Sequence, residues 1–131
     1  MIEELTVKTR NGSELINVTA EVRAVVEKSG VKNGICVVYT PHTTVGLLIN
    51  EDEPGFLSDL IRTLDKLVPE KGDYRHPDGN AHAHIKASLI GSSKDLPVKD
   101  GHLALGTWQS IFLCEFDGPR SRKVTVKVME G

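Results

Sequence analysis

Apolar and polar residues alternate along many short segments of the chain, and this alternation predicts a fold made mostly of strands. The clearest case is residues 123–129, where Val124, Val126 and Val128 share one face. Residues 35–40 are almost continuously apolar, which indicates a strand that is central in its sheet. About seven or eight strands are predicted, at residues 5–9, up to 16, 35–40, 45–49, 95–100, 103–108, 110–116 and 123–129.

Three further segments show the spacing of amphipathic helices, about 3.6 residues per turn. The first has Thr19 as its expected N-cap and ends at Gly30. The second begins at Pro54, because proline suits the first position of a helix, and stops at Pro69. The third covers residues 81–90, with an N-cap residue before it and a glycine after it.

Turn dipeptides suggest how the strands are connected. Asn11-Gly12 predicts a hairpin between the first two strands, and Asp100-Gly101 predicts another. Because hairpins rather than βαβ units link most strands, the sheets should be largely antiparallel. The predicted fold is a single α+β domain over residues 1–131, with a mostly antiparallel β-sandwich core and about three helices.

The charge and amino-acid composition of the chain argue against a nucleic-acid partner and against a membrane partner. Sixteen basic and eighteen acidic residues give a net charge of −2, and aromatic residues make up only 5%, so we expect no nucleic-acid partner. No apolar run approaches the roughly 20 residues of a membrane span, and the first ten residues lack the apolar core of a signal peptide. We therefore expect a cytoplasmic protein without a membrane partner. Cys36 and Cys114 lie in apolar strand-like segments and should be buried thiols.

Histidines are the main candidates for chemistry. His76, His82 and His84 fall within nine residues, and His42 lies where one predicted strand meets the next. Neutral imidazole is a common zinc ligand, so these residues could form a metal site, although unrelated surface and capping roles are the alternative. On a helix over residues 81–90, His82 and His84 would point about 200° apart. Only one of them can face a shared site, and we favour His84.

Two other features could line a pocket. Trp108 and Gln109 follow a predicted strand break, where the ring could stack on a ligand and the amide could form hydrogen bonds. A tryptophan packed in the core is the alternative. Glu115 interrupts an apolar strand and could accept a hydrogen bond from a histidine. Alternatively it faces solvent on an edge strand, which composition alone favours.

Several residues could bind a phosphate group. Cationic or hydroxyl donors of the kind that phosphate oxygens accept are offered by Lys86, Ser92, Ser93, Arg120, Ser121 and Arg122. The alternative is a solvated, charged turn at residues 117–122, which the sequence by itself favours.

Taken together, these motifs resemble the YjbQ-like family, also called the secondary thiamine-phosphate synthase-like proteins. The resemblance covers roughly residues 1–130 and rests on the following segments: His42-Thr43-Thr44 with Asn50-Glu51, Tyr74-x-His76, His84-Ile85-Lys86-x-Ser88 with Gly91, Gly101 with Gly106-Thr107-Trp108-Gln109, Glu115, and Gly118-Pro119-Arg120. It implies a compact α+β fold, a homotrimer, a histidine-lined metal pocket and a weak thiamine-phosphate synthase activity.

The resemblance also assigns expected roles, residue by residue. The metal ligands implied are His42, His76 and His84, and His82 is left as a neighbour. The expected cofactor is a divalent metal ion, with zinc favoured by the histidines and magnesium possible because diphosphates usually bind it. The expected catalytic residues are Glu51, Glu115 and Lys86, and the expected substrate-binding residues are Trp108, Gln109, Arg120, Arg122 and Ser93.

The predicted function is that of a small metal-dependent enzyme acting on a small phosphorylated metabolite. Weak thiamine-phosphate synthase activity is one form that this chemistry could take, and metal-assisted hydrolysis or transfer is equally consistent. The alternative is a non-enzymatic trimeric module that binds a metabolite or a metal.

Overall fold

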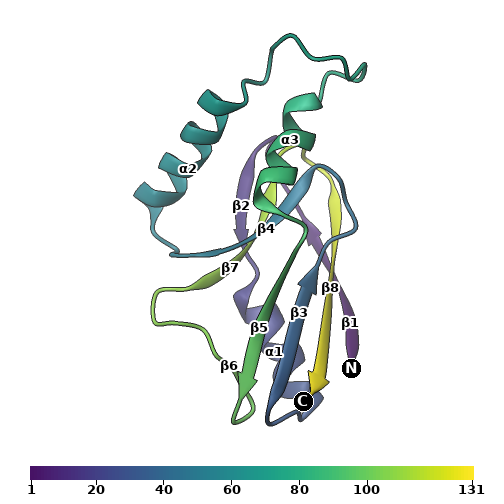
Figure 1. The fold of residues 1–131 in the computed structure, drawn as a ribbon, viewed down its shortest axis with the longest axis vertical. Helices are drawn as coiled ribbons and strands as arrows, with labels where there is room; N and C mark the ends of the chain where they lie inside the picture. The colour runs from purple at the N-terminus through teal and green to yellow at the C-terminus, as the bar shows by residue number, and fades with distance from the viewer.

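Two antiparallel sheets and three helices build the fold, in a computed structural model that describes residues 1–131 (Figure 1). The strands are β1 (Ile2–Lys8), β2 (Glu14–Asn17), β3 (Gly34–Tyr39), β4 (Val45–Asn50), β5 (Ser93–Lys99), β6 (His102–Leu103), β7 (Ser110–Glu115) and β8 (Ser121–Glu130), and the helices are α1 (Thr19–Ser29), α2 (Pro54–Leu67) and α3 (Ala81–Ile90). Sheet A has the order β1-β8-β3-β5-β6, and sheet B has the order β2-β7-β4. The predicted α+β class is confirmed.

The main core lies between the two sheets and is closed at one end by α1. Strands with alternating apolar residues contribute the side chains of this core. In β8, for example, Val124, Val126 and Val128 are buried, whereas the residues between them are partly exposed. From sheet B, Leu113 of β7 enters the same core, and from α1 so does Val22. β3 lies in the middle of sheet A, as its apolar sequence predicts.

A second, smaller core covers the opposite face of sheet B. Phe112 and Cys114 of β7 point away from the main core and pack against Ala83 and Ala87 of α3 and Leu64 of α2. The small alanine side chains let α3 lie close to the sheet, and this contact fixes the helix that carries His82 and His84.

Local signals place the helix ends well. Pro54 occupies the first turn of α2, and the Glu53 side chain accepts hydrogen bonds from Gly55 N at 2.9 Å and Phe56 N at 2.8 Å. Gly30 ends α1 in the left-handed region, with φ 69°. α3 covers residues 81–90 as predicted. No helix has the length and apolar character needed to cross a membrane.

Some predicted connections are wrong. Asn11-Gly12 does not join a hairpin, because β1 pairs with β8 in sheet A and β2 pairs with β7 in sheet B. A turn dipeptide reverses the chain locally but does not fix which strands pair. Thr19 is not the N-cap of α1, because its hydroxyl accepts a hydrogen bond from Ile111 N at 2.8 Å instead. The strand predicted at 103–108 shrinks to β6, and the residues that follow form a loop to β7.

Candidate functional site

The candidate site lies where the loop between β3 and β4 meets α3. Two hydrogen bonds fix the start of this loop: Thr40 N donates to Ser92 O at 3.0 Å, and the Thr40 hydroxyl donates to Lys123 O at 3.0 Å. The next residues, Pro41 and His42, are therefore held between β8 and the segment that follows α3. The loop presents the His42 ring from a fixed backbone.

One hydrogen bond defines the protonation state of His42. Its Nε2 accepts from the backbone N–H of Lys123 at 3.0 Å. A neutral imidazole has one acceptor and one donor nitrogen, so Nδ1 must carry the proton. Burial lowers the pKa of His42, and the charge of Arg122 lowers it further, which favours the neutral ring. His42 therefore offers an N–H donor from Nδ1.

The other histidines separate on α3 as helical geometry requires. His84 lies near His42, and its ring centroid is 4.7 Å from that of His76 in the preceding turn. His82 faces a separate cavity of about 460 Å³, where its Nδ1 lies 3.1 Å from Lys86 Nζ. The Lys86 ammonium, which is buried, also donates to Asp65 Oδ1 at 2.7 Å. Lys86, an expected catalytic residue, is thus on the far side of α3 from His42 and His84.

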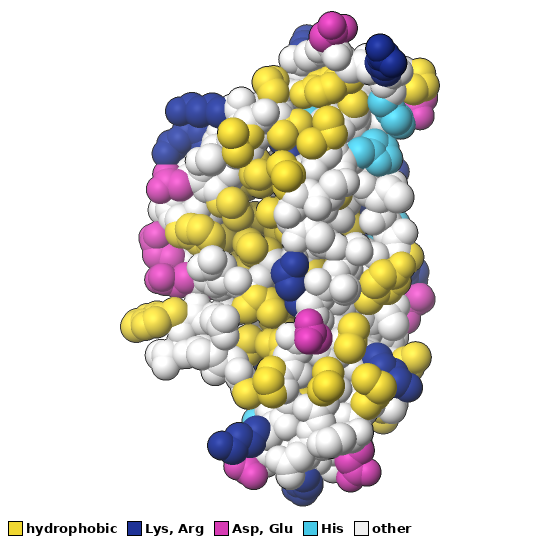
Figure 2. Space-filling view, viewed as in Figure 1, with side chains coloured by type: hydrophobic (Ala, Val, Ile, Leu, Met, Phe, Trp, Pro, Cys, Tyr) yellow, Lys and Arg dark blue, Asp and Glu magenta, His cyan; other side chains and the backbone are white.

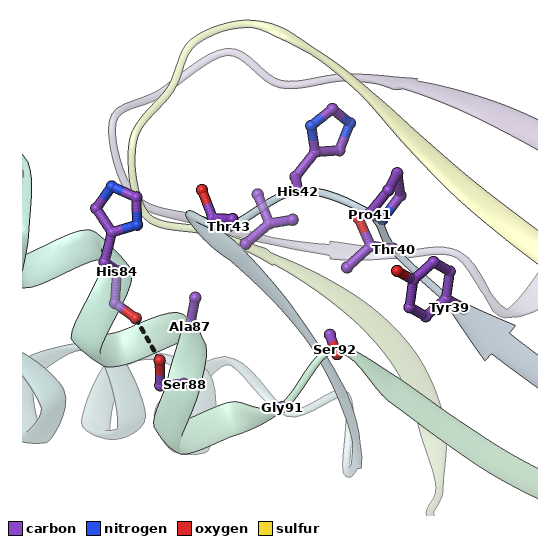
Figure 3. A pocket seen from close by; sticks show the side chains of 11 residues that line it. Tyr39, Thr40, Pro41, His42, Thr43, His84, Ala87, Ser88, Gly91 and Ser92 are labelled. Carbon is purple, nitrogen blue, oxygen red and sulfur yellow. Dashed lines mark hydrogen bonds between the residues drawn. The ribbon is translucent and has the colours of Figure 1, made fainter.

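Two adjoining cavities meet at His42 and His84, and they share Pro41, His42, Thr43 and His84. The first, called here the hydroxyl-lined cavity, has a volume of about 490 Å³. To those four it adds the hydroxyl-bearing residues Tyr39, Thr40, Ser88 and Ser92 and the residues Val45, Ala87 and Gly91. The second, the arginine-lined cavity, has a volume of about 350 Å³ and adds Thr44, Asn80, Asp117, Arg120 and Arg122. Figure 3 shows the hydroxyl-lined cavity, with the His42 and His84 rings on its rim and Thr43 between them. His76 does not line either cavity, but its ring is next to that of His84.

A buried ion pair supports the arginine-lined cavity. Glu115, with no exposed surface, accepts from Arg122 Nε at 2.7 Å and from Arg122 Nη2 at 2.5 Å. It also accepts from the Thr9 hydroxyl and from Asp117 N, each at 2.9 Å. Burial would raise the pKa of Glu115, but the hydrogen bonds from Arg122, from Asp117 and from Thr9 outweigh it and lower that pKa. Glu115 is therefore a buried anion in the central strand of sheet B, neither solvated nor bonded to a histidine.

Arg122 and Arg120 contribute to this cavity in different ways. Arg122, 2% exposed, uses Nη2 to hold Glu115 and the Thr44 hydroxyl, and its Nη1 makes no hydrogen bond within the chain. Arg120 is exposed and bonds Asp117 Oδ2 at 3.0 Å. The same carboxylate oxygen accepts from Asn80 Nδ2 at 2.8 Å, which ties the start of α3 to the turn. The turn at 117–122 was expected to be solvated, and this holds for Arg120 but not for the buried Arg122.

Four expected site residues lie elsewhere. Glu51 follows β4, and the six residues of that strand, roughly 17–20 Å in length, separate it from the loop that carries His42. Trp108 is 73% exposed in the β6–β7 loop, where Gln109 Oε1 accepts from Gly106 N at 2.8 Å. Ser93 begins β5 and lines neither cavity, although its neighbour Ser92 does.

The histidines fit the expected metal only in part. No three or more His, Cys, Asp or Glu side chains are grouped to hold an ion. The Lys123 N–H also occupies the His42 lone pair that a metal would need. The adjacent rings of His76 and His84 fit as two ligands of an ion, but a site with all three histidines does not fit. The zinc or magnesium cofactor stays a prediction.

Sequence reasoning missed several residues of the site. Tyr39 and Thr43 line the hydroxyl-lined cavity, and Asn80, expected only as a helix cap, borders the arginine-lined one. Ser92, expected to bind a phosphate group, lines the hydroxyl-lined cavity instead. The position of Thr43 in the histidine–threonine motif was a usable signal. Asn80 gave none, because its bond to Asp117 joins residues 37 apart in sequence.

The chain is similar to known proteins over almost its whole length. The family model described as "UPF0047 protein YjbQ-like" matches residues 3–131. A UPF0047 protein of Archaeoglobus fulgidus is 50% identical over 96% of this chain and 99% of its own length, and UPF0047 protein YugU of Bacillus subtilis is 42% identical over 98% and 99%. Among solved structures, a YjbQ/UPF0047 family protein of Clostridium acetobutylicum matches with a TM-score of 0.95 at 50% identity, covering 97% of this chain and 99% of that one. A YbjQ-like protein of unknown function from Sulfolobus solfataricus matches with a TM-score of 0.98 at 38% identity, covering 100% and 97%.

Proposed function

The chain belongs to the YjbQ-like UPF0047 family, and from its pocket we propose that it is a small metal-dependent enzyme acting on a small phosphorylated metabolite. The observation that carries the proposal is the arginine-lined cavity, where His42 offers Nδ1–H and Arg122 offers its unused Nη1. Its volume of about 350 Å³ lies within the range of small-molecule sites.

The donors favour an anion with several oxygens. Arg122 is held rigidly by Glu115, so little side-chain entropy is lost when a ligand binds to it. Hydrogen bonds from a guanidinium to phosphate oxygens are charge-assisted and stronger than neutral ones. Arg120 at the rim adds a second positive charge, although Asp117 offsets part of it.

The reactive group is best placed next to His84. The ring nitrogens of His84 make no hydrogen bond within the chain, and the ring borders both cavities, so one of them could bind a divalent ion beside the bond that joins the phosphate to the rest of the substrate. A divalent ion on His76 and His84 would neutralise charge on the departing group. Weak thiamine-phosphate synthase activity belongs to the same proposal, because both of its substrates carry phosphate groups that the arginine-lined cavity suits.

Binding and turnover can be tested with matched variants. We expect inorganic phosphate and pyrophosphate to bind in calorimetric titrations, and Arg120→Ala to weaken both. His84→Ala should abolish turnover of phosphorylated substrates in a panel and lower the bound metal measured by elemental mass spectrometry. His102→Ala, which removes an exposed imidazole in β6, is the control and should change neither. Absence of phosphate binding to the unaltered protein would refute the proposal.

The non-enzymatic module remains the second candidate, because the same donors would hold a metabolite without changing it. Tight binding of a phosphorylated ligand with no turnover, and with His84→Ala affecting binding alone, would favour that function.

The homotrimer is a proposal of its own. Large apolar side chains stay on the surface, including Leu67 at 69%, Leu89 at 61% and Trp108 at 73% exposed. Figure 2 shows apolar side chains gathered along α2 and beside α3. Burial of such surface is the usual driving force for association. Light scattering on the eluting protein should give three times the 14.3 kDa chain mass, and a monomer would refute the proposal.

A further inference from the structure

The two adjoining cavities differ sharply in charge. All the arginine and aspartate side chains of the pair lie in the arginine-lined cavity. Apart from His42 and His84, which both cavities share, the hydroxyl-lined cavity has no ionisable side chain other than the phenol of Tyr39. A ligand that fills both cavities therefore meets charge at one end only.

The uncharged end is rich in free hydrogen-bonding groups. The hydroxyls of Thr43, Ser92 and Tyr39 make no side-chain hydrogen bond within the chain. Thr40 donates its proton to Lys123 O, which leaves its oxygen lone pairs as acceptors. The hydroxyls of Thr43, Ser92 and Tyr39 can both donate and accept, whereas Ser88, like Thr40, donates its proton within the chain, to His84 O at 2.8 Å, and can only accept. This end therefore suits a partner with hydroxyl groups of its own.

From these contrasts we infer that the ligand is a phosphate monoester of a small, uncharged alcohol with further hydroxyl groups. Its phosphate lies in the arginine-lined cavity, and its body lies in the hydroxyl-lined one. The inference rests on the proposed function and adds the nature of the body. The ester bond then lies at the boundary, beside His42, Thr43 and His84, which line both cavities.

Specificity follows from the lining of the uncharged end, which includes no lysine or arginine. The Lys94 ammonium, which lies behind Gly91, donates to Ile90 O at 2.9 Å and is not part of that lining. A carboxylate on the body would lose its hydration there and gain no counterion, which is costly. A purely alkyl body would leave the hydroxyls of Ser92 and Thr43 without partners once water is displaced. A hydroxylated, neutral body avoids both penalties.

Three probes of similar size separate these cases: propyl phosphate, glycerol phosphate and 3-phosphoglycerate, with inorganic phosphate as the reference. In calorimetric titrations glycerol phosphate should bind at least about fivefold more tightly than propyl phosphate, as expected for one or two added neutral hydrogen bonds. It should also bind more tightly than 3-phosphoglycerate. Equal affinity for all three would overturn the inference while leaving phosphate binding, and with it the proposed function, intact. If inorganic phosphate and all three esters fail to bind, the proposed function itself fails.

Two neighbouring serines give a matched pair of variants. Ser92 lines the hydroxyl-lined cavity and Ser93 does not, and both are exposed, so neither change should disturb folding. Ser92→Ala should reduce the advantage of glycerol phosphate over propyl phosphate, and Ser93→Ala should preserve it. Ser88→Leu, on an exposed face of α3, should fill the cavity and remove the advantage, with inorganic phosphate binding as before. An unchanged advantage in both Ser92→Ala and Ser88→Leu would overturn the inference.

Discussion

Glu115→Ala should be the most destabilising single change in the network behind the pocket. The carboxylate is fully buried and accepts four hydrogen bonds, two of them from the Arg122 guanidinium. Removing it leaves Arg122, 2% exposed, as a buried cation without a counterion. Breaking a buried ion pair in this way typically lowers the free energy of unfolding by about 3–5 kcal/mol. That loss would be a large fraction of the total stability of a domain of this size.

Glu115→Gln provides a graded comparison. It keeps the shape and some of the hydrogen bonds but removes the negative charge, so we expect a loss of about 1.5–3 kcal/mol. Replacing both partners, in Glu115→Leu with Arg122→Met, removes the unpaired charge and should cost less than Glu115→Ala alone. Urea denaturation at one fixed protein concentration, followed by circular dichroism, measures all three. Fluorescence is a poor probe because Trp108 is 73% exposed already.

The pH dependence gives an independent check of the same reasoning. Because the folded-state pKa of Glu115 is lowered, its contribution to stability is complete above the unfolded-state pKa, about 4.3. It is lost as the pH falls through the lower folded-state pKa. Glu115→Gln should therefore show a shallower loss of stability below about pH 4.3. A cost below about 1 kcal/mol for Glu115→Ala, or an unaltered acid profile for Glu115→Gln, would refute the ion-pair account.

Three other predictions test the fold. Burial raises the pKa of Cys36 to about 11 and that of Cys114 to about 12, so neither thiol should react with DTNB at pH 8 until urea unfolds the chain; prompt labelling of the native protein would contradict the buried placement. Gly34→Ala would place a Cβ 1.9 Å from Met129 O, and the resulting backbone shift should lower stability by about 3 kcal/mol, whereas a melting temperature equal to that of the unaltered protein would show the pairing of β3 with β8 to be wrong. Thr19→Val removes the acceptor of Ile111 N and should cost about 1–3 kcal/mol in urea denaturation, and no loss would mean that this N–H finds another partner.

Local signals explain why the helices could be read from the sequence. Pro54 and Gly30 act on the backbone of their own turns, so their effects do not depend on distant residues. The same is true of the angle between His82 and His84, which follows from helical geometry alone. Long-range pairing carries no such signal: nothing near Asn11-Gly12 indicates that the strands on either side join different sheets.

The site was harder to predict because its chemistry depends on contacts between distant segments. From the sequence, Glu115 is expected to face solvent on an edge strand. In the structure it is bonded to Arg122 and to Thr9, which is 106 residues away in sequence. Lys86 and His84 are close in sequence, yet α3 directs them to different cavities. The tautomer of His42 depends on one backbone N–H in β8, which no side-chain motif reveals.

The place of β8 in sheet A has a consequence for protein synthesis. β8 pairs with β1 on one side and with β3 on the other, so the strand made last joins two strands made much earlier. On the ribosome, the edges of β1 and β3 that later pair with β8 have no partner until residues 121–130 leave the exit tunnel. Their unpaired edges are then open to other nascent chains, which is a known route to aggregation. Folding of this domain should therefore be completed only once β8 has left the tunnel, and ribosome-bound chains that end before β8 should be sensitive to protease.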